Sequence, residues 1–159
     1  MDATIDAVRV AGTPNGPTPI VVLAVDDEED ILPIFIGFEE ATSIARGVDA
    51  TDLGRPLTHD LLLDVIEELG GRVDRVHVAS IDDGTYIGEI HLNTPRQDTV
   101  VDARPSDALA LAARTDCPIT VAEAVFEAGR EAPERFAELD DIRDVVQTVA
   151  MGESEGFYE

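Results

Sequence analysis

Short apolar stretches separated by turn-forming residues dominate the first third of the chain. Residues 4–10 and 18–25 flank a turn centred on Asn15 and Gly16, and this arrangement predicts a β-hairpin. Residues 31–36 form a further apolar stretch after an acidic turn. The first third is therefore predicted to be an antiparallel sheet of three strands.

Two segments with helical spacing of apolar residues follow. Residues 39–46 place Ala41 and Ile44 on one face, which predicts a helix directly after the third strand. Residues 58–69 predict a second amphipathic helix, which the glycine pair at 70–71 ends. The apolar face of this second helix consists of Leu61, Leu62, Val65, Ile66 and Leu69.

Alternating polarity returns in residues 72–81 and 85–92, which predict a second hairpin around a three-residue loop at 82–84. The loop glycine is expected in the left-handed conformation. In this register the apolar residues share one face of the hairpin, and His77 lies opposite Glu89 on the other. A solvated cross-strand pair is the preferred interpretation of that polar face.

The last third predicts a strand over 99–103 and a buried helix, rich in alanine and leucine, that runs to Arg114. The remaining predicted elements are a short strand at 118–121, a short helix at 122–128 and a closing amphipathic helix at 133–150. Strands and helices in this order predict an α+β fold. The expected architecture is one compact domain with a mixed, largely antiparallel sheet packed against several helices.

Charge changes this picture more than length does. The chain has 159 residues, of which 34 are acidic and 11 basic, so the net charge is -23, and every basic residue is arginine. Such like charge repels at ordinary ionic strength, whereas at about 1 M salt the Debye length shrinks to roughly 3 Å. The composition therefore predicts a salt-rich cytoplasm, as in a halophilic archaeon.

Other functional classes are excluded by composition and motif. No apolar run reaches the ~20 residues of a membrane span, and the chain start lacks a basic signal-peptide region, so a soluble cytoplasmic protein without membrane partners is expected. Cys117 is the single cysteine, which excludes a disulfide framework. The glycine-rich phosphate loop, zinc-protease helix and serine-hydrolase elbow are all missing.

One polar pattern occurs twice, each time directly before an apolar helical run. The 55–60 motif reads Arg-Pro-Leu-Thr-His-Asp, and the 104–107 motif reads Arg-Pro-Ser-Asp. In both, a proline closes an extended segment and a hydroxyl residue stands where a helix N-cap is expected. Helix N-termini and arginines attract anions, so two converging motifs predict a phosphate-binding site.

The residue types in these motifs suit phosphodiester cleavage. The predicted catalytic residues are His59, Asp60 and Asp107, with His59 moving a proton. Arg55, Arg104 and Ser106 are the predicted substrate-binding residues. Carboxylates are oxygen ligands for Mg²⁺ or Mn²⁺. The predicted metal ligands are Asp60, Asp102, Asp107 and Glu40.

A purely structural interpretation explains the same spacing. Asp60 and Asp107 are favoured in a first helical turn by the helix dipole alone, and Arg104 can pair with Asp60. Glu40 either joins the site or satisfies the start of its own helix. The alternative to an enzyme is thus a non-catalytic binding or assembly domain.

The order of the motifs resembles the bifunctional nuclease domain family. The resemblance rests on Leu-Pro-Ile-Phe-Ile-Gly at 32–37 and on Glu40-Ala41 and Ile44-Ala45. It also rests on the 55–60 motif with the leucines that follow it, and on the 104–107 motif together with the preceding Asp102 and Ala103. It covers residues 1–130 and leaves a C-terminal helical extension, 131–150, and an acidic tail, 151–159. The resemblance implies a compact α+β domain with nuclease activity on RNA and DNA.

Two further expectations concern partners. Ionic attraction of nucleic acid weakens steeply with salt, so a nuclease in concentrated salt needs short-range contacts within a cleft. A homo-oligomer, with a dimer favoured, is expected because the closing helix has an apolar side that needs cover. Folding of that helix onto its own sheet is the alternative. Its apolar side consists of Phe136, Leu139, Ile142, Val145 and Val146.

Overall fold

The computed structural model describes residues 1–147, and one eight-stranded sheet forms their framework. The strand order is β3-β2-β1-β7-β4-β5-β6, and β8 pairs with β1. The strands are β1 (Asp2–Thr13), β2 (Gly16–Val25), β3 (Ile31–Phe35), β4 (Arg72–Asp82), β5 (Thr85–Asn93), β6 (Asp98–Ala103), β7 (Ile119–Val121) and β8 (Asp140–Asp141). The β4 and β7 pair is parallel, and the other strand pairs are antiparallel.

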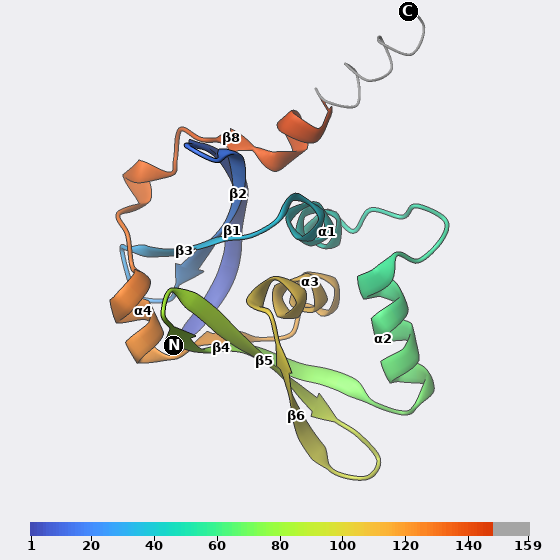
Figure 1. Cartoon of the computed structure of the whole chain (residues 1–159). Coiled ribbons are helices and arrows are strands. Elements are labelled where there is room, and N and C mark those ends of the chain that lie inside the picture. The colour runs from blue at the N-terminus through green and yellow to red at the C-terminus, as the bar shows by residue number, and fades with distance from the viewer. Residues whose placement is uncertain (148–159) are drawn as a thin grey trace, which may run out of the picture.

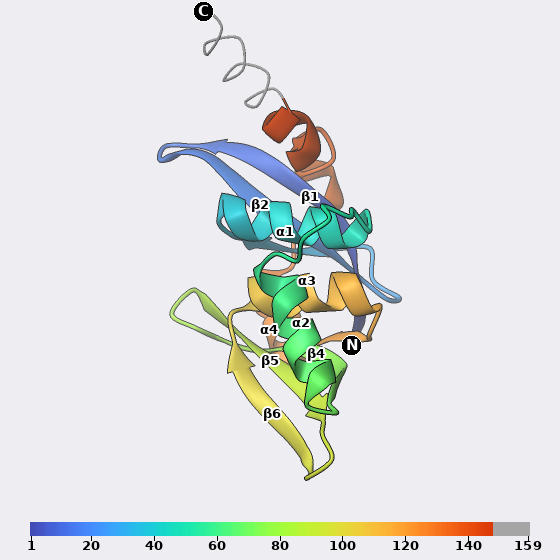
Figure 2. The same cartoon turned by 90° about the vertical axis from the view of Figure 1, so that its right-hand side faces the viewer.

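Two antiparallel units, β1–β3 and β4–β6, meet at the short strand β7, which pairs with both. The helices are α1 (Phe38–Val48), α2 (Thr58–Glu68), α3 (Pro105–Thr115), α4 (Glu123–Gly129) and the 3₁₀-helix η1 (Pro133–Arg135). Figure 1 shows α2 and α4 on opposite sides of the molecule, with α1 and α3 side by side between them. Figure 2 shows α1, α2 and α3 on the same side of the sheet. The predicted α+β class is confirmed.

Helix α3 lies at the centre of the core, as its small apolar residues predict. Leu109, Ala110 and Leu111 are fully buried. Its neighbour α1 approaches closely because α1 carries Gly47, where a Cβ atom would lie 2.8 Å from the Cβ of Ala113. Close packing of these two helices fixes the relative positions of their polar residues.

The second hairpin has the predicted register but a different turn. His77 is opposite Glu89, as predicted. Asp82 pairs with Thr85, so the loop has two residues rather than three. Asp83 and Gly84 both have positive φ angles, 50° and 82°, which is the two-residue geometry that matches strand twist.

The predicted closing helix over 133–150 is wrong for the part that the structure describes. The segment instead forms η1, turns, adds β8 to β1, and becomes helical at 142–147. Phe136 and Leu139 pack on a cluster that includes Ile20, and Ile142 is 1% exposed. Phe136, Leu139 and Ile142 thus cover the chain's own sheet, whereas Val146 is 37% exposed. Residues 148–150 of the predicted helix and the acidic tail lie outside the described residues.

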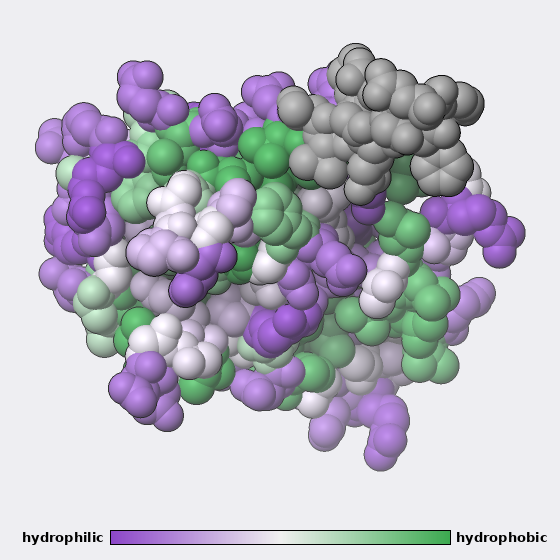
Figure 3. Space-filling view, turned by 45° about the horizontal axis from the view of Figure 1, so that its top comes forward, coloured by the Kyte–Doolittle hydropathy of each residue, from purple (hydrophilic) through white to green (hydrophobic). Residues whose placement is uncertain are grey.

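Helix α2 is confirmed, but its apolar face is largely open to solvent. It has no buried residue, and only Leu63 and Ile66 pack against the core. Green, hydrophobic areas lie between purple, hydrophilic side chains on the face that Figure 3 shows. The exposed apolar residues of α2 are Leu61, Leu62 and Val65, followed by Leu69 at its C-terminal end. No helix within residues 1–147 has the length and apolarity of a membrane span.

Candidate functional site

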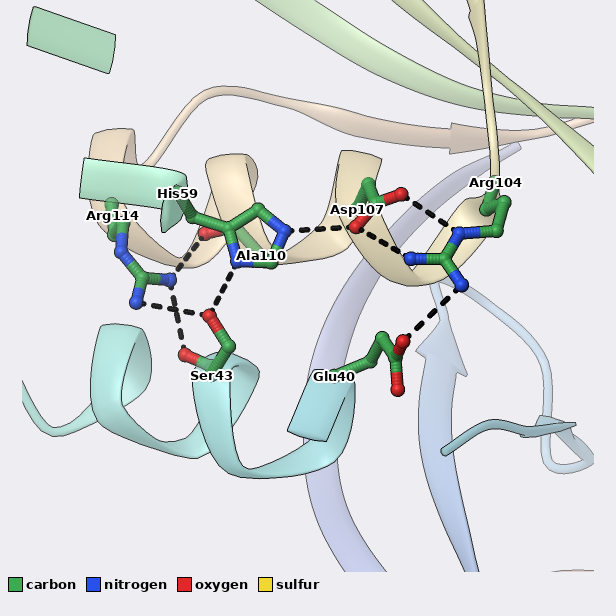
Figure 4. Close-up of polar contacts among 7 residues, drawn as sticks. All are labelled: Glu40, Ser43, His59, Arg104, Asp107, Ala110 and Arg114. Carbon is green, nitrogen blue, oxygen red and sulfur yellow. Dashed lines mark hydrogen bonds and ion pairs between the residues drawn. The ribbon is translucent and has the colours of Figure 1, made fainter. Parts of the chain in front are cut away.

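Three helices bring a serine, a histidine and an aspartate into a continuous hydrogen-bonded chain. Ser43 Oγ on α1 lies 2.6 Å from His59 Nδ1 on α2, and His59 Nε2 lies 2.9 Å from Asp107 Oδ1 on α3. Figure 4 shows the imidazole between the other two side chains. Two members of the predicted catalytic set, His59 and Asp107, are therefore in direct contact.

The order of donors and acceptors in this hydrogen-bonded chain follows from the groups at its two ends, Arg114 and Asp107. Arg114 Nη2 donates to Ser43 Oγ at 3.1 Å, because a guanidinium has no acceptor. The carboxylate of Asp107 accepts, so neutral His59 carries its proton on Nε2. Nδ1 then accepts from the Ser43 hydroxyl. The basic nitrogen of His59 thus points toward Ser43, and Asp107 fixes the ring.

Arg104 connects Asp107 with the first helix. Its guanidinium donates to both carboxylate oxygens of Asp107, at 2.9 and 3.2 Å, and lies 3.2 Å from Glu40 Oε1. Burial, the largest single influence, raises the pKa of Asp107, but hydrogen bonds from Arg104 and His59 outweigh it and hold that pKa below its ordinary value. Asp107 therefore remains a carboxylate at neutral pH.

Arg114 ties all three helices together. Its side chain is 9% exposed. It donates to Asp60 Oδ1 at 2.7 Å, to the backbone oxygen of Ser43 at 3.0 Å and to that of Ala110 at 2.9 Å. The hydrogen bond from Arg114 is the main cause that lowers the pKa of Asp60. The expected Arg104–Asp60 pair is therefore wrong, since Arg114 holds Asp60 and Arg104 holds Asp107.

The predicted hydroxyl caps are also wrong. The N-cap residues are Leu57 for α2 and Arg104 for α3, so Thr58 and Ser106 already lie within the helices. Asp60 Oδ2 satisfies the start of α2 by accepting from the backbone N–H of Leu57 at 3.1 Å. Ser106 is 6% exposed and is not among the cleft residues described next.

Two cavities open beside this network and share one arginine. The His59 cleft has a volume of about 660 Å³ and is lined by Glu40, Ser43, Arg46, His59, Arg104 and Asp107, among others. The Arg55 cavity, of about 450 Å³, is lined by Arg46, Gly47, Asp52, Arg55, Asp60 and Arg114, among others. The 55–60 motif is therefore divided between the two cavities, whereas Arg104 and Asp107 line only the His59 cleft. The two arginines predicted to bind one phosphate, Arg55 and Arg104, line different cavities.

The four predicted metal ligands do not assemble into a donor set. Glu40 and Asp107 share Arg104 as a partner, and Asp60 is paired with Arg114. Asp102 is exposed on β6, in register with Glu89. Within residues 1–147, no three His, Cys, Asp or Glu side chains are grouped to hold a metal ion. These residues, as arranged, do not fit the predicted Mg²⁺ or Mn²⁺ site.

Ser43 and Arg114 are absent from the sequence prediction, although each leaves a signal. Ser43 is a polar residue on the apolar face of α1, next to Ile44. Arg114 follows Asp107 by seven residues, which is two helical turns, so both lie on one face of α3. A buried arginine two turns from an aspartate indicates a shared polar surface.

Comparison with known proteins identifies the family of this chain. Residues 21–133 match the family model of the bifunctional nuclease domain, which is most of the chain. This protein belongs to the bifunctional nuclease domain family.

Its similar proteins include uncharacterized and named relatives. An uncharacterized protein, present in two strains of Mycobacterium tuberculosis, is 36% identical over 138 residues, covering 86% of this chain and 81% of the relative. Bifunctional nuclease 2 of Oryza sativa subsp. japonica is 27% identical over 111 residues, covering 67% of this chain and 34% of the plant protein. Bifunctional nuclease 2 of Arabidopsis thaliana is 28% identical over 113 residues, 68% of this chain and 34% of its own length.

Proposed function

We propose that this chain is a nuclease that hydrolyses phosphodiester bonds of RNA and DNA in the His59 cleft. The observation that carries the proposal is the directed chain from Arg114 through Ser43 and His59 to Asp107, which lies along an open cleft. A base held by an orienting carboxylate is the arrangement that general base catalysis requires. Family membership and the plant relatives named as bifunctional nucleases support the same reaction class.

In the proposed reaction, Arg104 binds the scissile phosphate and His59 accepts a proton. Arg104 is 65% exposed, so its guanidinium can exchange Glu40 for a phosphate oxygen without leaving Asp107. Both ring nitrogens of His59 are occupied, so the proton of an attacking water passes through Ser43 Oγ to Nδ1. Asp107 stabilises the resulting imidazolium, as an orienting carboxylate does in other base dyads. As the P–O bond to the leaving sugar oxygen breaks, that oxygen takes up the proton and His59 returns to its neutral form.

The decisive experiment measures cleavage of labelled single-stranded RNA and duplex DNA by the wild type, His59→Gln and His77→Gln. His77 is a matched control because it is a part-buried histidine that contacts Thr120 outside the cleft. We expect His59→Gln to lose about 10²–10⁴-fold of the cleavage rate and His77→Gln to lose none. Equal rates for His59→Gln and wild type would overturn the proposed role of the cleft.

Dependence on a divalent ion is a separate arm of that assay. The sequence predicts dependence on Mg²⁺ or Mn²⁺, but the carboxylates as arranged give no step that uses an ion. Cleavage is therefore measured with each metal and with a chelator. Cleavage that persists in chelator at the wild-type rate would remove the metal from the proposal and leave the His59 route.

A non-catalytic binding or assembly role is the second candidate, and one observation favours it. Within the described residues, every buried side-chain nitrogen or oxygen atom has a hydrogen-bond partner, including those that link the three helices. Such a closed network also serves as a clamp between helices. If the folded wild type cleaves no nucleic acid under any condition, that result would support a non-catalytic role, in which the network only holds the three helices together.

We further propose a salt-rich cytoplasm, as in a halophilic archaeon, and a homodimer. The net charge of -23 supports the first. The wild-type melting temperature should rise between about 0.1 and 1 M KCl as screening reduces repulsion.

The exposed face of α2 supports the dimer, since Leu61 is 54% exposed and Val65 47%. Light scattering should show a dimer that Val65→Asp converts to a monomer.

A further inference from the structure

Two arginines of the Arg55 cavity have guanidinium groups without partners. Arg46 and Arg55 make no ion pair and no side-chain hydrogen bond within residues 1–147, and the exposed loop residue Arg96 shares this property. The other arginines contact a carboxylate, a hydroxyl or a backbone oxygen. On a chain with 34 acidic residues, two unpaired arginines in one cavity are unexpected.

The charge of the cavity is opposite in sign to that of the whole chain. It is lined by three arginines and two aspartates. Asp60 is paired with Arg114, and Asp52 accepts a hydrogen bond from the backbone N–H of Gly54. Arg46 and Arg55 therefore give the cavity a positive charge in a protein whose net charge is -23. A concave, positively charged surface favours an anionic ligand.

The position of Arg46 connects this cavity with the proposed site of cleavage. Arg46 lines both the Arg55 cavity and the His59 cleft, so the two cavities adjoin at this residue. The next residue, Gly47, lines the Arg55 cavity, and a Cβ there would lie 2.9 Å from Arg114 Nη1. A ligand that extends from the cleft past Arg46 would enter the second cavity.

We propose that the Arg55 cavity is a second phosphate subsite, in which Arg46 and Arg55 bind the phosphodiester next to the one at Arg104. This inference rests on the proposed function, because its ligand is the nucleic acid strand undergoing cleavage. It adds a substrate requirement: efficient cleavage needs two consecutive phosphates. It also gives an acidic protein a locally positive surface for nucleic acid.

A helix-dipole effect is the competing explanation for Arg46. The residue lies in the last turn of α1, where a positive charge is favoured by the dipole. That effect would reduce stability in Arg46→Gln without changing which substrates are preferred. It does not apply to Arg55, which lies in the loop before α2.

The first test compares two short substrates, a dinucleoside monophosphate and a trinucleoside diphosphate, using kcat/KM. The wild type should prefer the longer one. Arg46→Gln and Arg55→Gln should each reduce this preference by about tenfold, the loss expected for one charge-assisted hydrogen bond. Arg96→Gln removes the same charge outside both cavities and should leave the preference unchanged. Unchanged preference in all three variants would overturn the subsite.

The second test measures binding without catalysis. Fluorescence anisotropy follows a labelled hexathymidylate with phosphorothioate linkages, in chelator, from about 0.2 to 1 M KCl. The slope of log K against log salt is negative, and it should be less steep by about 0.7 in Arg55→Gln than in Arg96→Gln, the value for one phosphate contact on a single strand. Equal slopes would contradict the subsite even if the wild type cleaves. A less steep slope in Arg55→Gln, together with no cleavage by the wild type, would retain the subsite and refute the nuclease.

Discussion

Replacement of Arg114 by methionine tests whether the interhelical network holds the site together. The side chain is 9% exposed and makes hydrogen bonds with Asp60, Ser43 and Ala110. Breaking a buried ion pair costs about 3–5 kcal/mol. Because the Asp60 side chain is 42% exposed and can regain water, we expect roughly 2–3 kcal/mol here. At about 2–4 °C per kcal/mol, the melting temperature should fall by roughly 5–10 °C.

Arg143→Met is the matched control for this measurement. Arg143 pairs with Asp49 at 3.0 Å but is 51% exposed, so its pair contributes only about 0–1 kcal/mol. Thermal melts followed by circular dichroism, in about 0.1 and 1 M KCl, give both values under the same conditions. The larger effect of Arg114→Met should persist in high salt, since the pair is shielded from solvent on one side. Equal shifts for the two variants would show that Arg114 does not hold the three helices together.

Other consequences concern acid sensitivity, helix packing and the serine. The depressed pKa of Asp107 means that its ionised form contributes stability above the ordinary value of 3.8, and that this contribution is lost as pH falls through the lowered pKa. Thermal melts below about pH 5 should therefore decline less steeply in Asp107→Asn than in wild type. Gly47→Ala should lower the free energy of unfolding in urea by about 1 kcal/mol, because the clash with Ala113 exceeds the gain in helix propensity; a more stable variant would contradict this. Ser43→Ala should retain more of the cleavage rate than His59→Gln, since a water molecule can replace the hydroxyl as a relay; equal losses would make Ser43 more than a relay.

Local features of the sequence predicted much of the fold. The helix over 58–69 was predictable because its apolar spacing and the glycines that follow are local signals; Gly70 takes a φ of 83° and its N–H donates to Glu67. The closing segment was not predictable, because its residues follow contacts distant in sequence. Asp141 on β8 lies in register opposite Arg9 on β1. Phe136 packs on the apolar cluster that includes Ile20. These contacts override the helical spacing.

The candidate site was predicted in part for a geometric reason. Neighbouring residues of a helix point about 100° apart. His59 therefore turns toward Asp107 while Asp60 turns toward Arg114 and the other cavity. The sequence prediction treated the 55–60 motif as part of one site, whereas His59 and Asp60 line different cavities. Ser43 and Arg114 were missed because the contacts between them join helices 71 residues apart in the chain.

The sharpest test of the His59 site is cleavage of labelled single-stranded RNA and duplex DNA by wild type and Asp107→Asn in molar KCl, with equal folding shown by circular dichroism. We expect the wild type to cut, and we expect the variant, whose carboxamide no longer orients and stabilises protonated His59, to lose at least about 10²-fold in rate. Cleavage by a folded Asp107→Asn at the wild-type rate would contradict the proposed role of the His59–Asp107 pair. No cleavage by the folded wild type would leave the network as a clamp between helices.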